Sequence, residues 1–447
     1  MEKPTLPKGT RDFGPLQMAR RLFILDTIRV VFKKYGFQPL ETPAMENLST
    51  LTGKYGEEGD QLLFRILNSG DFLKESDPSA LSEKNSKKVS SQISEKGLRY
   101  DLTVPFARYV VMNQHELAMP FRRYQIQPVW RADRPQKGRY REFYQCDADV
   151  VGTDSLICEA EIVLMIREVF EGLGIRDYRI MINHRDVLSG LAALAGARGN
   201  EGAFFVALDK LDKIGEEKVR EELAAKGITG NGVDHVFELL RKPGKTISDL
   251  RQVFSDAGQR GLNDLEEVMK LTGEVAQLEF DLSLARGLSY YTGCIFEVKV
   301  PSSGIGSVSG GGRYDNLTQA FGAKEKLSGV GISFGIDRIY DVLEILDLFP
   351  AGSRSGTGIL LCHFDETTRM HAFRLATDLR NAGIAAEVYP DVVKIKKELE
   401  YANKKSIPLA LIIGEEEMKT GMLTLKDLTS GNQEKITAEE LIKRLRG

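Results

Sequence analysis

The sequence predicts an α+β domain on an antiparallel sheet with a helical insertion, followed by a small C-terminal α/β domain. In the larger part, β-favouring runs come in pairs joined by loops, and helical segments arrive in a block. After a Gly- and Ser-rich linker, strands and helices alternate instead. At ~150 residues per domain, the 447 residues allow about three domains. We expect them at 1–349, with the insertion at 190–260, and at 356–447.

Composition excludes several classes of protein. Apolar residues make up 42% and charged residues 28%, which is ordinary for a globular chain. No run approaches the ~18 apolar residues of a membrane-spanning helix, and the first residues lack the apolar stretch of a signal peptide. The four cysteines are far apart and the five histidines lack metal-ligand spacing. We therefore expect a cytoplasmic protein with no membrane association and no dedicated metal site.

The N-terminal third begins with an amphipathic pattern. Residues 19–35 carry apolar side chains on one helical face, and Gly36 is placed to end that helix. Residues 38–42 then favour an extended chain up to Pro43. The Ser-, Lys- and Glu-rich stretch 74–96 has almost no apolar residues, which predicts a mobile surface insertion.

Two alternating runs predict an antiparallel strand pair. The runs cover 121–131 and 141–151, and the loop between them is rich in turn-forming and basic residues. Asp154 is expected to cap a helix that ends near Phe170, and a strand should follow at 178–183.

The remaining elements complete this pattern. Strands are expected at 278–284 and 290–300, followed by a glycine-rich run at 309–315 and a helix from Ile332 to Leu346. In the C-terminal domain we expect strands at 359–364, 385–389, 409–413 and 422–426, and helices at 367–381, 392–405 and from 438.

Local charge indicates a site for a polyanion. The net charge is −3, yet the segment 121–143 holds seven basic and two acidic residues. A solvated hairpin would explain the same charge. The glycine patterns of P-loops and dinucleotide folds are absent, so arginines would have to hold a phosphate compound. Candidates are Arg131 at a strand end, Arg286 before a strand, and Arg338 early in a helix.

Several segments together resemble a known family. Residues 121–147 and 329–339 resemble motifs 2 and 3 of class II aminoacyl-tRNA synthetases, and the stretch ending at Pro43 resembles motif 1. Arg-Gly-Leu-Ser-Tyr-Tyr-Thr-Gly at 286–293 and Gly-Gly-Arg-Tyr-Asp-Asn-Leu at 311–317 are similar to stretches peculiar to histidyl-tRNA synthetases. Residues 7–13 and 98–109 match that family as well, so the resemblance runs from about residue 4 to the C-terminus.

The resemblance implies a class II catalytic domain and a C-terminal anticodon-binding domain. It implies ligation of L-histidine to tRNA(His) through a histidyl-adenylate, with ATP and its accompanying Mg²⁺. It also implies a homodimer with motif 1 at the interface. Five lysines on one predicted C-terminal helix fit contact with the RNA backbone, although a solvated helix face would look the same. They are Lys394, Lys396, Lys397, Lys404 and Lys405.

Family roles carry over at matching positions. Arg131 would hold the α-phosphate and the histidine carboxylate, with Arg286 opposite, and both would be catalytic. Arg139 and Arg338 would grip the ATP phosphates, and Phe143 would stack on adenine. The histidine pocket would comprise Asp101, Thr103, Gln145, Asp149, Tyr290 and Tyr291, together with Arg131 and Arg286.

Other interpretations of these residues stay open. Asp101 and Asp149 could be strand-end acids paired with a local arginine, and only one of the two adjacent tyrosines should face a site if they lie on a strand. Ser289 stands where many family members carry an acid, and Asp101 where some bacterial members carry glutamate. A non-catalytic regulatory paralogue typically lacks the C-terminal domain, which is present here. The Arg-Gly-Leu-Ser-Tyr-Tyr stretch argues against a threonine or proline synthetase.

Overall fold

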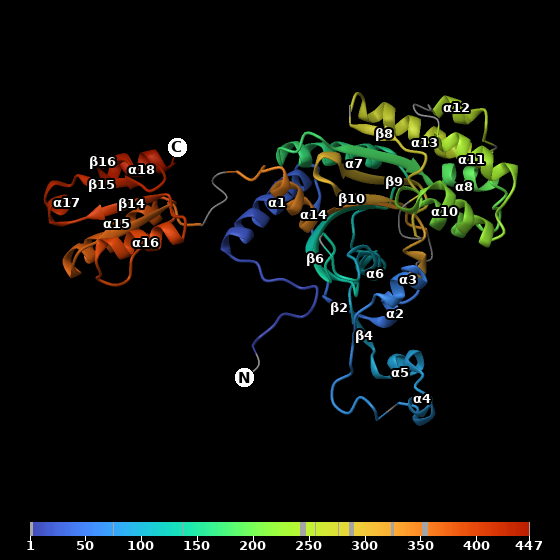
Figure 1. The fold of residues 1–447 in the computed structure, drawn as a ribbon, viewed down its shortest axis with the longest axis horizontal. Coiled ribbons are helices and arrows are strands. Elements are labelled where there is room, and N and C mark those ends of the chain that lie inside the picture. The colour runs from blue at the N-terminus through green and yellow to red at the C-terminus, as the bar shows by residue number, and fades with distance from the viewer. Residues whose placement is uncertain are drawn as a thin grey trace. The chain divides into compact units, whose positions relative to one another are not determined.

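The computed structural model describes residues 3–74, 76–136, 138–241, 247–254, 256–275, 277–285, 290–322, 326–350 and 356–446. Its contacts divide the chain into two compact units (Figure 1). One comprises Met1–Arg11 with Ile24–Leu348, and the other comprises Asp12–Phe23 with Phe349–Gly447. The domain boundaries expected from the sequence remain predictions.

An eight-stranded sheet organises the larger unit. Its order is β1-β5-β6-β11-β10-β9-β7-β8, and every neighbouring pair is antiparallel except β1–β5 and β7–β8. The α+β class with a mainly antiparallel sheet is therefore confirmed. The strands are β1 (Gln38–Pro39), β5 (Phe121–Trp130), β6 (Glu142–Val151), β7 (Arg179–His184), β8 (Leu278–Phe280), β9 (Cys294–Val300), β10 (Ile305–Tyr314) and β11 (Gly329–Gly335).

Helices cover both faces of this sheet. On one side, α7 (Ile157–Gly172) packs against β11, and α14 (Ile336–Ile345) against β6 and β10. Phe32 of α1 (Pro15–Lys34) joins this core, since its ring lies 5.7 Å from Tyr124 and 5.9 Å from Phe334. On the other side lies α6 (Thr103–Asn113), inside the curve of the sheet in Figure 1. Its apolar side chains share a core with Val151 and Tyr314.

Two further groups of elements belong to this unit. A three-stranded sheet of β2 (Met45–Asn47), β4 (Lys96–Leu98) and β3 (Arg65–Ile66) lies with α2 (Leu48–Leu51) and α3 (Gly56–Gln61). The described helices of the insertion extend from residue 185 to 272. They are α8 (Arg185–Leu194), α9 (Glu201–Leu208), α10 (Leu211–Ala225), α11 (Asn231–Arg241), α12 (Ile247–Arg251) and α13 (Asp256–Thr272).

The C-terminal part of the second unit is an α/β sheet in the order β13-β12-β14-β15-β16. The first three strands run parallel and the last two antiparallel. Strands are β12 (Ile359–His363), β13 (Ala386–Val388), β14 (Leu409–Ile413), β15 (Leu423–Asp427) and β16 (Gln433–Ile436). Helices are α15 (Glu366–Asn381), α16 (Ile395–Lys404), α17 (Glu415–Thr420) and α18 (Ala438–Arg446).

Three local predictions need correction. The stretch 74–96 forms α4 (Pro78–Ser82) and α5 (Ser86–Ile93), because Asp77 and Asn85 cap them with side-chain hydrogen bonds. Asp154 caps no helix, since α7 begins only at Ile157 and its N-cap is Leu156.

The third correction concerns the helix expected from Ile332, which follows the glycine-rich region. Residues 305–314 form strand β10, and Ile332 lies in strand β11 because the helix begins only at Ile336. Glycine is usually unfavourable in strands, but here its small size allows close approach: a Cβ on Gly311 would lie 2.0 Å from the Gly331 carbonyl oxygen.

Candidate active site

The central strands of the large sheet have one polar and one apolar face. Side chains alternate along a strand, so every second residue of β5, β6 and β11 points the same way. The register places Arg123 opposite Asp149 and Gln125 opposite Asp147. The same face carries Gln127, Gln145, Gly331, Ser333 and Gly335. We call it the polar face; the opposite face holds the buried Tyr124, Cys146, Ala148, Val150, Val330, Ile332 and Phe334.

Asp149 is held on the polar face by two partners. The Tyr314 hydroxyl donates a 2.7 Å hydrogen bond to Oδ1, and the Arg123 guanidinium lies 2.7 Å from Oδ2. Burial raises the pKa of Asp149, and the Arg123 charge opposes that rise. Asp149 is thus paired with a local arginine, as the structural interpretation of the sequence allowed, yet it also lines a cavity.

Asp147 lies two residues before Asp149 and is 2% exposed. Its Oδ1 atom has no hydrogen-bond partner in the described structure. Burial raises the pKa of Asp147 to about 7; the Arg123 charge lowers it and the Asp149 charge raises it. The sequence analysis did not assign this residue to the site.

A third buried carboxylate, Asp101, lies just before α6. It accepts hydrogen bonds from the Val104 backbone N–H at 3.0 Å and from the hydroxyls of Tyr55 at 3.2 Å and Tyr290 at 3.4 Å. Burial raises the pKa of Asp101. The Tyr290 and Tyr291 rings meet edge to face, with centroids 5.0 Å apart.

A small cavity of about 20 Å³ lies against Asp147 and Asp149. It is lined by Thr103, Asp147, Asp149, Tyr291, Gly310, Gly311, Gly312, Tyr314, Gly331, Ile332 and Ser333. Gln145 lies beside it on β6, where its Nε2 donates to the Ser333 hydroxyl at 2.9 Å. The structure therefore gathers Thr103, Asp149 and Tyr291 at one cavity, with Gln145 on the same face and Tyr290 bonded to Asp101.

The arginines at the end of β5 extend this site. The Arg131 guanidinium lies 4.1 Å from the Tyr100 ring centroid and 5.2 Å from that of Phe143. Its Nε donates to the Tyr100 carbonyl at 3.0 Å, next to Asp101 in the chain. A guanidinium held between aromatic rings keeps a fixed orientation and its charge, which suits it to bind an anion.

The other predicted arginines differ in what they contact. Arg139 pairs with Asp133 at 2.7 Å and keeps about half of its side chain exposed. Arg338 donates to the carbonyls of Gly138 at 3.1 Å and Ser307 at 2.5 Å, so it holds the basic loop close to α14. Arg286, predicted to face Arg131, lies outside the described residues.

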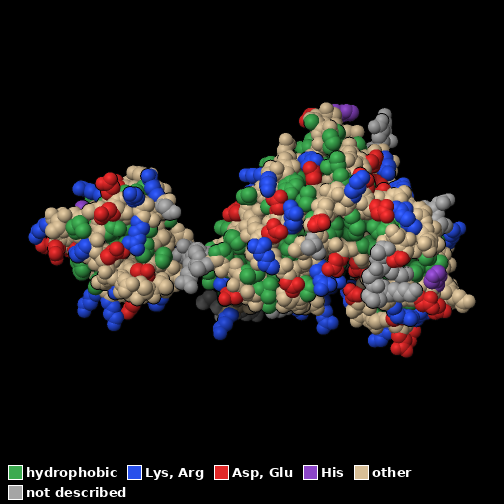
Figure 2. Space-filling view, turned by 90° about the horizontal axis from the view of Figure 1, so that it is seen from above, with side chains coloured by type: hydrophobic (Ala, Val, Ile, Leu, Met, Phe, Trp, Pro, Cys, Tyr) green, Lys and Arg blue, Asp and Glu red, His purple; other side chains and the backbone are tan. Residues whose placement is uncertain are grey.

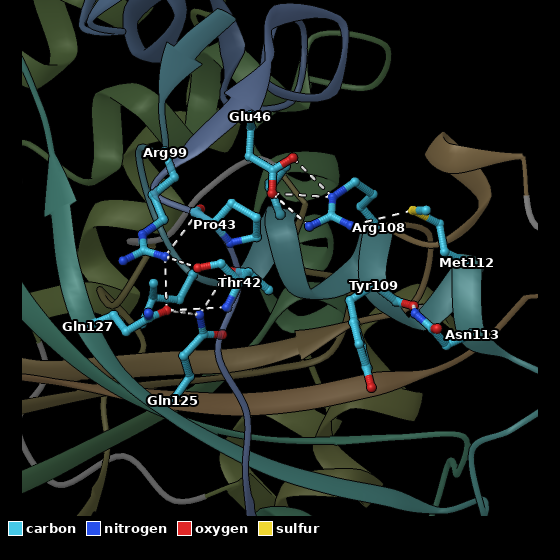
Figure 3. A network of polar contacts seen from close by, with 12 residues as sticks. Thr42, Pro43, Glu46, Arg99, Arg108, Tyr109, Met112, Asn113, Gln125 and Gln127 are labelled. Carbon is cyan, nitrogen blue, oxygen red and sulfur yellow. Dashed lines mark hydrogen bonds and ion pairs between the residues drawn. The ribbon is translucent and has the colours of Figure 1, made fainter.

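A polar network around Arg99 contacts the segment of Thr42 and Pro43 (Figure 3). Buried Arg99 donates to the Thr42 carbonyl at 2.7 Å, the Pro128 carbonyl at 2.9 Å and the Gln127 Oε1 at 2.9 Å. Its own carbonyl accepts from the Trp130 N–H at 3.1 Å. Burial lowers the pKa of Arg99 to about 10. This side chain therefore ties the segment before Pro43 to the strand end that carries Arg131.

Sequence reasoning missed Arg99, Arg123, Asp147 and Tyr314 as parts of this site. All four lie within stretches that resemble the family but received no role. The alternation of strands 121–131 and 141–151 placed Asp147 on the same face as Asp149, so this signal was present in the sequence. The pairing of Arg123 with Asp149 required the register.

Within the described ranges, no three His, Cys, Asp or Glu side chains gather closely enough to hold a metal ion. The same ranges contain no helix that is long and apolar enough to cross a membrane.

Family models match most of the chain. The model "Histidyl-tRNA synthetase" covers residues 71–339, and "Anticodon binding domain" covers residues 357–447. A histidine–tRNA ligase of Cytophaga hutchinsonii is 58% identical over the whole of both chains. That of Phocaeicola vulgatus is 53% identical over 98% of each chain.

A solved structure has the same architecture. The histidyl-tRNA synthetase of Nostoc sp. PCC 7120 superposes with a TM-score of 0.84 at 29% identity, covering 100% of this chain and 99% of that one. These matches run through both units and through the strands that carry the polar face. The chain belongs to the histidyl-tRNA synthetase family.

Proposed function

We propose that this chain activates L-histidine with ATP to form histidyl-adenylate and then transfers the histidyl group to tRNA(His). AMP and diphosphate are the other products. The observation that carries the proposal is a cavity lined by carboxylates and hydroxyls, together with an arginine that lies against two aromatic rings and bonds to the residue before buried Asp101. The carboxylates and hydroxyls suit an ammonium and an imidazole, and the arginine suits a phosphate.

We assign the histidine pocket to the predicted residues. Asp101 and Asp149 supply negative charge for the ammonium and imidazole groups. Their hydrogen-bonded tyrosines fix the orientation of both carboxylates. Thr103, Gln145, Tyr290 and Tyr291 complete the pocket with hydroxyl and amide groups. A site that hydrogen-bonds a polar side chain discriminates strongly against analogues that lack it.

We assign ATP to the side of the pocket on which the predicted arginines lie. Arg131 and Arg286 would flank the α-phosphate, Arg139 and Arg338 would bind the remaining phosphates, and Phe143 would stack on adenine. A histidine carboxylate oxygen attacks the α-phosphorus, and the bond to the departing diphosphate breaks. Two anions must approach each other in this step, so positive charge on both sides lowers the barrier.

In the part of the chain that the structure describes, no group of three His, Cys, Asp or Glu side chains could hold a metal ion. The Mg²⁺ that accompanies ATP is usually held by one or two carboxylates together with the phosphates, and no step of the reaction is routed through it.

The C-terminal α/β sheet is the proposed reader of tRNA(His). The five lysines are exposed; three lie on α16, whereas Lys394 and Lys405 flank it, and Lys405 pairs with Glu387. Positive and negative side chains are interspersed on the face shown in Figure 2, so a broad basic coat does not cover that face. Binding would then depend on local phosphate contacts, which weaken as salt increases.

We propose a homodimer in the cytoplasm. Motif 1 lies near exposed apolar side chains, among them Val30, Met45 and Met112, which are 66, 55 and 71% exposed. Such side chains favour burial against a second copy. The four cysteines are buried and free, as is usual in a reducing compartment.

Amino-acid-dependent ATP–pyrophosphate exchange, run with each of the twenty amino acids, tests the proposed reaction. We expect exchange with histidine alone, and a loss of about a hundredfold in Arg286→Ala. A regulatory paralogue would show no exchange with any amino acid, and another class II synthetase would respond to a different one. Either result would overturn the proposal.

A further inference from the structure

We propose that Asp147 binds the α-ammonium group of the amino-acid substrate and so acts as an additional specificity-determining residue. The inference rests on the function proposed above and concerns the same pocket. It adds a third carboxylate to the two assigned from the family pattern, and it follows from unpaired acceptors, charge and cavity size.

Unpaired acceptor oxygens gather around Asp147. The Oδ1 of Asp147 and the Oε1 atoms of Gln125 and Gln145 are buried and have no hydrogen-bond partner in the described structure. Gln125 lies directly across the β5–β6 ladder from Asp147, and Gln145 lies two residues along the same strand. Buried acceptors normally have a donor, so a donor-rich group belongs between them. An ammonium group carries three N–H donors.

The charges on the polar face are also unbalanced, and one additional cation would neutralise them. Asp147 and Asp149 are both buried, and the Arg123 guanidinium contacts Asp149 at 2.7 Å. The second oxygen of Asp149 is taken by the Tyr314 hydroxyl. Within the described ranges, one arginine thus faces these two carboxylates, and an uncompensated buried carboxylate is costly. At neutral pH the substrate ammonium is fully charged, whereas a free imidazole is largely neutral.

The size of the cavity favours the ammonium over the imidazole. Asp147 and Thr103 line a space of about 20 Å³, which is enough for one water-sized group. An ammonium group is about that size, whereas an imidazole ring is several times larger. Asp149, Tyr291 and Tyr314 line the same space, so the imidazole ring must lie outside it, elsewhere in the pocket.

The test compares the full-length wild type with Asp147→Asn in ATP–pyrophosphate exchange. Two inhibitors separate the groups of the substrate: histidinol has the ammonium and the imidazole, and imidazolepropionate lacks the ammonium. We expect the KM for histidine and the Ki for histidinol to rise about ten- to a hundredfold. The KM for ATP and the Ki for imidazolepropionate should stay within about twofold.

Asp315→Asn is the matched control, because Asp315 is also a buried carboxylate but bonds to Ser328 and Lys326 away from the cavity. In Asp315→Asn, the KM for histidine should not rise relative to the KM for ATP. A parallel rise of both inhibition constants in Asp147→Asn would assign Asp147 to the imidazole and overturn the proposal, as would unchanged constants. If Asp147→Asn does not fold, Asp147→Ser is measured in the same way. Wild-type exchange without any response to histidine would instead refute the proposed function.

Discussion

Gly331 gives the sharpest test of the pocket geometry. It lies opposite Asp149 in the β6–β11 ladder. A Cβ at this position would lie 2.1 Å from Asp149 Oδ1, 2.6 Å from its Cγ and 3.0 Å from the Ala148 carbonyl oxygen. Ordinary contact begins near 3.4 Å, so Gly331→Ala must displace the carboxylate or the strand by about 1 Å.

A displacement of this size at a substrate-binding group costs about a hundredfold in rate. We therefore expect kcat/KM for histidine to fall about a hundredfold in ATP–pyrophosphate exchange. The KM for ATP should change less than about threefold, because the clash lies on the histidine side. Overpacking should also lower the free energy of unfolding by about 1–3 kcal/mol, measured by urea titration.

Gly306→Ala is the control, since a Cβ there meets nothing within 4 Å. It should leave both kinetic constants and stability nearly unchanged. If Gly331→Ala retains wild-type kcat/KM for histidine, Asp149 is not a substrate-binding group in the position described. Equal losses for histidine and ATP would point to general disruption of the sheet.

Three further predictions follow from the contacts. Tyr314→Phe removes the 2.7 Å hydrogen bond to Asp149 and should raise the KM for histidine about tenfold or more without changing that for ATP; equal changes would contradict this role. Glu159→Gln leaves buried Arg313 without its ion pair and should lower the free energy of unfolding in urea by about 3–5 kcal/mol. A decrease below about 1 kcal/mol would show that this ion pair does not stabilise the fold as expected. Burial raises the pKa of Asp147 in the folded state to about 7, above its value in the unfolded chain. The free energy of unfolding of the wild type should therefore fall as pH rises from about 4 to 7. Without substrate, the melting temperature of Asp147→Asn minus that of the wild type should therefore increase from about pH 4 to about pH 7. A difference that stays constant over this range would contradict the raised pKa of Asp147.

Much of the fold could be predicted from local sequence. The strands at 121–131 and 141–151 alternate cleanly, and Gly36 ends its helix with a positive φ of 79°. The helices in 74–96 were missed because side-chain caps at Asp77 and Asn85 support them where apolar periodicity is weak. Residues 329–335 were assigned partly to a helix, because a buried apolar strand that runs into a helix has no local boundary signal.

The site was only partly predictable, for a physical reason. Arg131 stood in a recognisable motif, and Asp149 follows the end of that motif by two residues. The roles of Arg123 and Tyr314 depend on which residues of distant strands face each other, and pairwise register is a tertiary property. Arg99 likewise acts through carbonyl groups of Thr42 and Pro128, which carry no side-chain signature in the sequence.

The central claim is that the carboxylates of the polar face bind histidine rather than serve only to hold the sheet together. The most direct measurement is the KM for histidine and for ATP in Asp149→Asn, with folding checked by thermal melting. We predict that the KM for histidine rises at least tenfold while the KM for ATP stays within about twofold. Equal shifts in both constants, or none, would show that Asp149 is a structural partner of Arg123 and Tyr314 and that the histidine pocket lies elsewhere.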